Sequence, residues 1–514
     1  MKKLFIILAF VLQYISLYSQ LQDRIWIFGR PYSGSTNATL YFGDLSNPVV
    51  NLPSGQPDHI TASDGKEQWA VVTNPITGEL IFYTDGKNVF DHQHVLVNAL
   101  DLGASVSGAQ PVAIAPVPKG DEDPNFSTYY IFSNETGAFP TTFNVGTIKY
   151  RYYDVMTGAF GTSQDLPGTY GTANVTEGMK IIPCDTSLSI LWLVASLYPS
   201  SGNETKYVVY KINRNVVTYQ GVYDMGPEKQ SVPSGASTIV EITYTKANTS
   251  CGITNVGFAV QYTSAVFTCQ FDNLSGRFLT GTARTLYTGI TTAVPSVYNV
   301  EFSPNGRFLY YTIYASTGSS DNTLYQVDLN DAILTPTPVH TFSATYAGGL
   351  KLGPDSLIYH ISDDGTNSNT LSVGRILQPD VKFIPGTTVF NQFYQEDFAT
   401  YNDVIGVGFS ETLIMPTSLP CGSLAISEDS GRSEQINLSV YPNPASDMVN
   451  LKISNKTNSC LTLKIYDIFG KLIRSELISR DKEQINTTSL NNGVYVLVVS
   501  TKDSFNVQKL IIQK

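Results

Sequence analysis

The feature that most constrains the fold is a short pattern that recurs along this chain of 514 residues. In each copy an aromatic or β-branched segment ends in Asp or Asn, and a turn follows. Taken in order, the seven copies lie at intervals of roughly 47 to 63 residues, which is near the period of propeller repeats. The copies, from clearest to loosest, are Tyr153–Gly158, Phe271–Gly276, Val327–Asn330, Tyr210–Asn213, Phe42–Asp44, Phe90–Asp91 and Arg375–Leu377.

The segments between these copies are typical of short strands joined by tight turns. Clusters of Gly, Pro, Asn or Asp bound each of them. In Asn74–Gly78 and Ser303–Gly306, Pro comes where φ is near −65° and Gly comes where φ must be positive. The expected strands include Gln68–Thr73, Leu80–Asp85, Pro111–Val117, Thr128–Ser133, Leu188–Ala195, Tyr207–Asn213, Phe308–Thr312 and Leu357–Ile361.

This pattern predicts an all-β protein whose large domain is a β-propeller. Seven blades are favoured, because radial closure of four-stranded sheets protects the edges that a linear array exposes. A second repeat, Phe302–Gly306 echoed by Leu352–Ser356, supports the same period. Six or eight blades stay open, as does a pair of β-sandwiches with coincidental turn spacing.

Composition supports the β class and excludes one class of partner. The chain has 31 Tyr and 25 Phe but only 15% charged residues, which suits pleated surfaces. Its formal net charge of −11 argues against binding nucleic acid through phosphates. After the N-terminus, every apolar segment of transmembrane length is interrupted by charges or turn residues.

The N-terminus is typical of a signal peptide. Lys2 and Lys3 precede the apolar segment Leu4–Leu12 and a plausible cleavage site at Tyr18–Gln20. Residues 1–19 are therefore expected to be removed during Sec-dependent export, and an uncleaved anchor is the alternative. We expect a propeller domain at 20–420, a polar linker at 421–435, and a small antiparallel β-sandwich at 436–514.

The five cysteines are an odd number, so at least one is unpaired within a monomer. Cys251 and Cys269 are placed to bridge neighbouring strands. The alternative is that all five, including Cys184, Cys421 and Cys460, are small buried hydrophobic residues.

The final unit carries the clearest signature, in four segments: Val440–Ala445, Leu463–Leu472, Leu490–Leu497 and Val507–Lys514. In order and spacing they resemble the type A C-terminal sorting domain of type IX secretion substrates in Bacteroidota. The resemblance implies a seven-stranded antiparallel sandwich. It also implies two partners for residues 436–514, the type IX secretion machinery and a sortase-like surface peptidase that removes the domain. An ordinary small sandwich for stability or adhesion is the alternative.

Turn chemistry inside this unit agrees with the resemblance. Asp467 and Gly470 suit a turn between strands. Asn492-Gly493 predicts a tight turn with positive φ at Gly493, before a strand rich in Tyr and Val.

A looser likeness covers the start of the large domain. Its segments are Trp26–Gly29, Gly78–Gly86, Val89–Asp91 with His94, Gln110–Pro116 and Tyr129–Phe132. They resemble the N-terminal part of large propeller-like secreted proteins of Bacteroidota that carry type IX sorting domains. Ile27 and Phe90 depart from that pattern, and the match weakens beyond residue 180. This resemblance supports the propeller and implies no substrate.

Catalytic, metal and cofactor sites have little support in the sequence, and none is assigned. His92 and His94 are spaced to present two imidazoles on one face for a metal, but a hydrogen-bonded His94 fits better. The acids at strand ends (Asp44, Asp85, Asp154, Asp272 and Asp328) are expected to accept hydrogen bonds from their own turns. Asp121–Asp123 is expected to be a solvated loop rather than a calcium site.

Three functions remain. The first is a secreted or cell-surface protein whose propeller binds a glycan or an envelope protein, as an adhesin or motility-associated component. The second is a secreted polysaccharide hydrolase or lyase. The third is a purely structural role in a surface layer. A cluster of two or more acids with His or Tyr at one mouth of the propeller favours the enzyme.

Overall fold

In the computed structural model, the described residues fall into two compact units, one through most of 23–412 and one over 437–514. The expected signal peptide and the expected linker at 421–435 lie outside the described residues. The structure describes residues 23–28, 38–43, 48–51, 69–74, 77–84, 88–99, 110, 112–117, 127–134, 148–168, 173–183, 190–199, 206–213, 216–225, 240–245, 252–260, 265–289, 296–314, 322–342, 346–363, 370–387, 390–397, 411–412, 437–454, 461–467, 472–478, 484–500 and 505–514.

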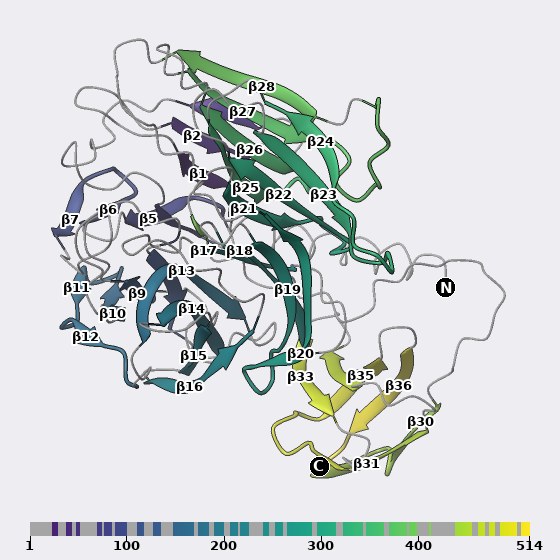
Figure 1. Cartoon of the computed structure of the whole chain (residues 1–514). Helices are drawn as coiled ribbons and strands as arrows, with labels where there is room; N and C mark the ends of the chain where they lie inside the picture. Colours follow the sequence, from purple (N-terminus) through teal and green to yellow (C-terminus); the bar gives the residue numbers. More distant parts are fainter. Residues whose placement is uncertain are drawn as a thin grey trace. The chain divides into compact units, whose positions relative to one another are not determined.

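The described part of the larger unit forms seven sheets, which follow one another along the chain (Figure 1). We number them sheet 1 to sheet 7. Sheet 1 holds β1 (Ile25–Phe28), β2 (Ala38–Tyr41) and β3 (Val49–Asn51). Sheet 2 holds β4 (Ala70–Thr73), β5 (Leu80–Thr84), β6 (Asn88–Asp91) and β7 (Leu96–Ala99). Sheet 3 holds β8 (Val112–Pro116), β9 (Thr128–Asn134), β10 (Ile148–Asp154), β11 (Ala159–Phe160) and β12 (Gln164–Asp165).

The other four sheets each contain four antiparallel strands in chain order. Sheet 4 holds β13 (Ala173–Pro183), β14 (Leu191–Pro199), β15 (Lys206–Asn213) and β16 (Val216–Asp224). Sheet 5 holds β17 (Val240–Tyr244), β18 (Ile253–Val260), β19 (Ala265–Asp272) and β20 (Arg277–Thr288). Sheet 6 holds β21 (Ser296–Phe302), β22 (Phe308–Tyr314), β23 (Thr323–Asp328) and β24 (Thr337–Thr341). Sheet 7 holds β25 (Tyr346–Leu352), β26 (Ile358–Asp363), β27 (Thr370–Ile376) and β28 (Phe390–Asp397).

The seven sheets are arranged as the blades of a β-propeller. The first strand of each sheet contacts the first strand of the next, from β1 through β25. The last sheet returns to the first, because Trp26 and Phe42 pack edge-on against Tyr359 of β26. Seven is the number that the sequence favoured. A blade count for the whole chain stays a prediction, since the sheets are counted on the described residues alone.

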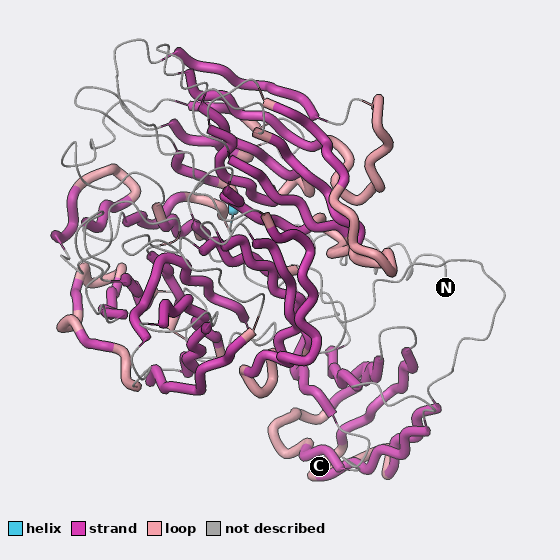
Figure 2. Tube along the Cα trace, in the orientation of Figure 1, coloured by secondary structure: helices cyan, strands magenta, loops and turns pink. Residues whose placement is uncertain are grey.

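A strand from the end of the larger unit joins an early sheet. Strand β29 (Glu411–Thr412) pairs in parallel with β4, opposite Ala70 and Val71. The other strand pairs of the larger unit whose registers the structure describes are antiparallel, so this return is a distinct feature of the topology. It ties the end of the propeller chain to its beginning. Figure 2 shows that the described chain consists almost entirely of strands and loops.

The expected strands and turns of the larger unit are confirmed where the structure describes them. Six of the seven repeat copies end the third strand of a sheet, and the Phe42 copy follows the middle strand of sheet 1. Gly78, Gly158, Gly276 and Gly306 have φ between 67° and 74°, the left-handed conformation that the turn pattern required. Asp44, Asp85 and Asp121–Asp123, to which the sequence analysis gave structural roles, lie outside the described residues.

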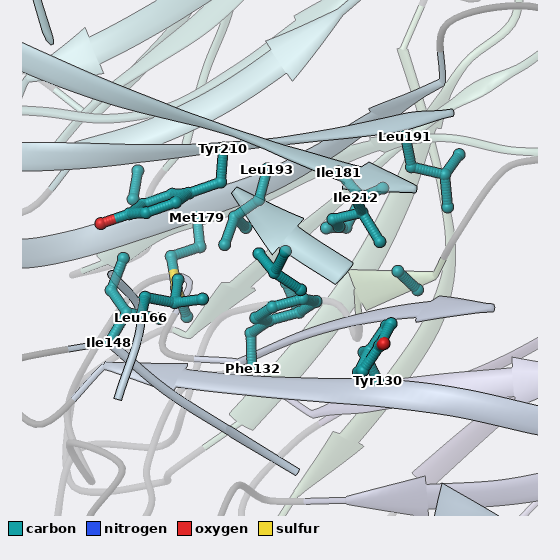
Figure 3. Close-up of a cluster of buried hydrophobic side chains, with 14 of the residues drawn as sticks. Tyr130, Phe132, Ile148, Leu166, Met179, Ile181, Leu191, Leu193, Tyr210 and Ile212 are labelled. Carbon is teal, nitrogen blue, oxygen red and sulfur yellow. The ribbon is translucent and has the colours of Figure 1, made fainter. Parts of the chain in front are cut away.

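Apolar side chains fill the space between neighbouring sheets. Figure 3 shows one such core, between sheets 3 and 4, where Phe132, Met179 and Leu193 have no exposed surface. Burial of this kind stabilises a fold by about 25 cal/mol for each Å² removed from water. Each sheet is therefore apolar on both faces, which explains strands such as Ala70–Thr73 in which every side chain is buried.

The smaller unit is a sandwich of two antiparallel sheets. One has the order β30-β31-β34 and the other β33-β32-β35-β36. Leu451, Leu463, Leu497 and Leu510, from both sheets, are buried in one shared core. The strands are β30 (Asn437–Tyr441), β31 (Met448–Ser454), β32 (Leu461–Asp467), β33 (Leu472–Ile478), β34 (Gln484–Asn486), β35 (Gly493–Ser500) and β36 (Phe505–Ile512).

The expectation for Gly493 is wrong. Gly493 is the first residue of β35, paired with Ile512, and it is not among the described residues with positive φ. The reason is the neighbouring strand: β36 continues to Ile512, opposite Gly493, and beyond it Lys514 N donates to Asn492 Oδ1 at 2.8 Å. Pairing with β36 therefore extends β35 back into the segment that resembled a turn.

The proposed bridge between Cys251 and Cys269 is not formed. Cys269 is a free, buried thiol on β19, and burial raises its pKa. Its Sγ lies 3.7 Å from Thr282 Oγ1 of the partner strand β20. The alternative, a small buried hydrophobic residue, therefore holds for Cys269; the other four cysteines lie outside the described residues.

Candidate functional site

The acids that end the third strands hold their own turns. Asp154 Oδ1 accepts hydrogen bonds from Met156 N at 2.9 Å and Thr157 N at 3.2 Å. Asp272 Oδ1 accepts from Leu274 N at 3.0 Å. These bonds confirm the structural role that the sequence predicted for Asp154 and Asp272, because their oxygens satisfy backbone donors that the strand leaves unpaired.

Asp328 has a second role, as the anion of an ion-pair network. Arg307 donates to it through Nε at 3.0 Å and through one terminal nitrogen at 2.7 Å. Lys382 Nζ lies 3.6 Å from the same carboxylate. The hydrogen bond from Arg307 lowers the pKa of Asp328. A carboxylate held ionised in this way is a poor general acid.

The same turns also join neighbouring sheets. Trp192 of β14 donates its indole N–H to the carbonyl of Asn273 at 2.7 Å, across from sheet 4 to sheet 5. Tyr310 of β22 donates to the carbonyl of Pro379 at 3.0 Å, across from sheet 6 to the segment after β27. The recurring pattern is therefore an element of the scaffold, and its acids are occupied.

Among the described residues, His92 and His94 are not joined by further ligands into a metal site. His94, with φ of 64°, lies 3.1 Å through Nδ1 from the hydroxyl of Tyr83. Burial lowers the pKa of His94, and the nearby Asp91 opposes that shift. His92 is exposed. No group of three or more His, Cys, Asp or Glu suited to a metal occurs in the described part of the chain.

The inner strands contain a buried carboxylate that sequence reasoning missed. Glu301 of β21 is 6% exposed. Its Oε1 accepts from Thr243 Oγ1 of β17 at 2.8 Å, and its Oε2 accepts from Leu352 N of β25 at 3.0 Å. Glu301 thus ties the first strands of sheets 5, 6 and 7. The signal was an acid inside a strand, next to Phe302, rather than at its end.

The side-chain amide of Gln110 makes a similar connection, between sheet 3 and sheet 5. Gln110, just before β8, donates from Nε2 to the carbonyl of Ile242 at 3.0 Å. Its Oε1 accepts from the N–H of the same residue at 3.0 Å. The side chain of Gln110 therefore pairs with both backbone groups of Ile242, as a residue of a neighbouring strand would.

An ion pair connects the first sheet to the last. Lys351 Nζ lies 3.1 Å from Asp23 Oδ1 and 4.6 Å from the centre of the Trp26 ring. Trp26 donates its indole N–H to the same Asp23 oxygen at 2.7 Å. The three groups satisfy one another at the place where the ring of sheets closes.

One acid in the large unit has the environment of a proton donor. Burial raises the pKa of Asp355, and the hydroxyl of Tyr359 donates to its Oδ2 at 2.6 Å. Tyr359 itself is packed against Trp26. The pair consists of one acid and one tyrosine, and so falls short of the cluster of acids that would favour a glycosidase.

In the smaller unit, the first sequence motif is fixed to the last strand. Asn443 Oδ1 accepts from Ile511 N at 2.8 Å, and Asn443 Nδ2 donates to the carbonyl of Lys509. Ala445 N donates to Ile511 O at 2.8 Å, and Gln513 N donates to Ala445 O at 2.8 Å. The two ends of the domain therefore form one structural element.

Comparisons with known proteins identify this smaller unit. Residues 439–513 match the family model described as "Secretion system C-terminal sorting domain". No curated protein matches the chain. No described helix is long and apolar enough to cross a membrane.

Solved structures resemble the larger part of the chain only distantly. A protein from Lactobacillus plantarum is 12% identical with a TM-score of 0.46, over 76% of this chain and 99% of that one. A putative 6-phosphogluconolactonase from Bacteroides uniformis is 13% identical with a TM-score of 0.41, over 75% and 98%. An ulvan lyase of a polysaccharide lyase family is 12% identical with a TM-score of 0.36, over 69% and 83%. At these TM-scores the likenesses carry no argument about function.

The sandwich, its motif and the family match agree on the terminal unit. The chain is a protein with a propeller-like fold that is exported by type IX secretion to the cell surface or beyond.

Proposed function

We propose that the propeller is a binding scaffold, which presents its loops to a glycan or to another protein of the cell envelope. In this proposal residues 1–19 direct Sec-dependent export through the periplasm of a member of the Bacteroidota. Residues 20–420 form the scaffold and 421–435 a linker. Residues 436–514 engage the type IX machinery and are then removed by a sortase-like surface peptidase. An adhesin or a motility-associated component fits this organisation.

The observation that carries the proposal is how the described acids are used. Asp154 and Asp272 hold turns, Asp328 is neutralised by Arg307, and Glu301 ties three inner strands. A scaffold whose acids are engaged in this way is suited to hold loops rigidly, and rigid scaffolds with exposed loops are typical binding proteins.

Binding is tested with the chain lacking residues 1–19. We expect saturable retention on a glycan array or on isolated outer-membrane fractions, with protease treatment of the fractions separating protein ligands from glycans. Absence of saturable binding to either, by a chain that melts cooperatively, would contradict the scaffold function.

Export is tested separately. Removing residues 436–514 should leave a folded propeller in the periplasm, and fusing those residues to an unrelated exported protein should carry it to the surface or the medium. Mass spectrometry of surface material should show loss of the terminal unit by cleavage within 421–435, where a flexible backbone can enter a peptidase site. Normal surface delivery of the truncated chain would defeat the sorting role, and full-length surface chains ending at Lys514 would defeat removal.

The second candidate is a polysaccharide hydrolase or lyase, and the pair of Asp355 and Tyr359 is the observation in its favour. A carboxyl with a raised pKa, hydrogen-bonded to a tyrosine, is suited to proton transfer. We expect reducing ends or unsaturated products from an acidic polysaccharide if this is correct, and their loss in Asp355→Asn. Activity that persists in Asp355→Asn would remove this pair from the reaction.

A further inference from the structure

Four rings lie against one another between sheets 6 and 7, and two of them are histidines. His360 of β26 is stacked on Phe342, with ring centres 4.1 Å apart and planes 10° apart. His340 of β24 is stacked on Phe390 of β28, with ring centres 4.3 Å apart and planes 20° apart. The two stacks touch edge-on, because His340 lies 4.6 Å from Phe342. We call these four residues the ring cluster.

His360 is the unusual member of the ring cluster. Its side chain has no exposed surface, and neither of its ring nitrogens has a hydrogen-bond partner in the described structure. A buried polar group without a partner costs free energy, so native proteins contain few of them. Nothing in the local fold requires a histidine there, since a phenyl ring would stack on Phe342 equally well.

The surroundings of His360 would leave a positive charge uncompensated. On its own sheet His360 is paired with Leu350 of β25 and Gly374 of β27, so these two residues share its face. Phe342 and His340 come from sheet 6, whereas Phe390 comes from β28 of the same sheet as His360. The hydroxyl of Tyr310 is engaged by Pro379 and Gln326. The charged residues next to Leu350 and Gly374 in the sequence, Lys351 and Arg375, are paired with Tyr359 and so lie on the other face.

Close packing makes the cluster intolerant of movement. A Cβ on Gly374 would lie 2.0 Å from Phe390 Cζ, so the Phe390 ring crosses directly over the glycine to reach the histidines. His340 also lies close enough to His360 to disfavour a proton on it. Protonation of His360 therefore introduces charge where no solvent reaches and where its described ring neighbours are uncharged.

We propose that the ring cluster is an acid-sensitive joint: protonation of His360 loosens the packing of sheet 7 against sheet 6. His340, which is half-buried, is the member that solvent protons reach first. The neutral cluster holds the two sheets together, and the protonated cluster separates them.

The direction of the pH dependence follows from burial. Burial lowers the pKa of His360 from 6.5 to about 3, and it also lowers the pKa of His340. When the two sheets separate, His360 regains its ordinary pKa. Between pH 6.5 and 3 the separated state therefore binds a proton on His360 that the packed state does not bind. Stability of the joint is complete above pH 6.5 and falls as the pH decreases through that window.

The test is hydrogen exchange on the chain lacking only residues 1–19, corrected for the intrinsic effect of pH. Between pH 7 and 5 the linkage for His360 alone gives about a 25-fold rise in the opening equilibrium. We expect protection in β24 and β26 to fall by about that factor, and to fall much less in sheets 3 and 4. In His360→Phe the fall should shrink to under about 3-fold, whereas His92→Gln, at an exposed histidine, should behave as the wild type.

Equal loss of protection in wild type and His360→Phe would overturn the proposal, as would a loss spread evenly over all sheets. If His360→Phe does not fold, the wild-type chain still decides the question by NMR of its five histidines. One resonance with contacts to phenylalanine ring protons should not titrate between pH 7 and 5. Titration of all five near pH 6.5 would overturn the joint.

Discussion

Two glycines occupy equivalent turns of the recurring pattern. Alanine substitutions at the two positions separate the cost of backbone strain from the cost of a contact with a neighbouring sheet. Gly158 and Gly276 end the copies after β10 and β19, with φ of 69° and 67°. A Cβ on Gly158 would meet nothing within 4 Å, whereas a Cβ on Gly276 would lie 2.2 Å from the Trp192 ring. Alanine at either position incurs the same left-handed backbone strain, and only Gly276→Ala also meets a neighbouring sheet.

The magnitudes follow from these two terms. Left-handed φ costs a residue with a Cβ about 1–2 kcal/mol, so Gly158→Ala should lower the free energy of unfolding by about that amount. Overpacking against a buried ring adds about 1–3 kcal/mol, which gives about 2–5 kcal/mol for Gly276→Ala. The change in the unfolded chain is common to both variants and cancels in the comparison.

Urea unfolding, followed by tryptophan fluorescence and far-ultraviolet circular dichroism, measures both values. Native-state fluorescence should change in Gly276→Ala alone, because Trp192 must move and its hydrogen bond to Asn273 is disturbed. Adding Trp192→Phe should recover part of the excess cost, as a double-mutant cycle would show. Equal losses in the two glycine variants would refute the inference that this turn is fixed against sheet 4.

Three further predictions concern the contacts that join distant segments. Glu301→Gln should lower the free energy of unfolding by about 3 kcal/mol, because one buried N–H or hydroxyl loses its acceptor. The control Glu79→Gln, in an exposed turn, should change the free energy of unfolding by under about 0.5 kcal/mol, and urea unfolding measures both variants. Asp328→Asn should destabilise sheets 6 and 7 more than Lys382→Ala does, because the lysine is exposed. The hydrogen bond from Arg307 lowers the pKa of Asp328 in the folded protein, so the stability that Asp328 contributes is present above pH 4 and should be lost as the pH falls below about 3.9, the unfolded pKa. Melting temperatures of the wild type and Asp328→Asn, measured over a pH series, should therefore converge at low pH. A difference in melting temperature that does not depend on pH would mean that the ion-pair network is incidental. Asn443→Ala should lower the free energy of unfolding of the sorting domain by about 1–2 kcal/mol, and the control Asn450→Ala, at an exposed side-chain contact, should lower it by less than half of that. Equal losses in thermal unfolding would mean that Asn443 does not fix the motif to the last strand.

The turns could be predicted from the sequence because their chemistry is local. An Asp that ends a strand accepts hydrogen bonds from residues two or three positions later, as Asp154 and Asp272 do. Glycine at the left-handed position follows for the same reason. Spacing of these turns then predicted the propeller, because a repeated sheet of constant length has few ways to protect its edges.

The remaining contacts depend on which sheet lies next to which, and no local pattern records that. Lys351 meets Asp23 only because the ring of sheets closes, and Gln110 meets Ile242 across 132 positions of sequence. Gly493 shows the opposite failure: its dipeptide is typical of a turn, but pairing with β36 determined its conformation. Tertiary pairing overrides local preference wherever an adjacent strand continues past the expected turn.

The position of an acid along its strand is therefore informative about its role. An acid at the end of a strand has free N–H groups of the turn within reach, so Asp154 is satisfied within its own hairpin. An acid inside a strand has fewer free donors nearby, because most of its neighbours' N–H groups belong to the ladder. Glu301 accepts one local hydrogen bond, from Phe302 N at 2.9 Å, and its other partners lie on β17 and β25. In a chain with few charges, an acid within an inner strand thus points to a contact between sheets before it points to chemistry.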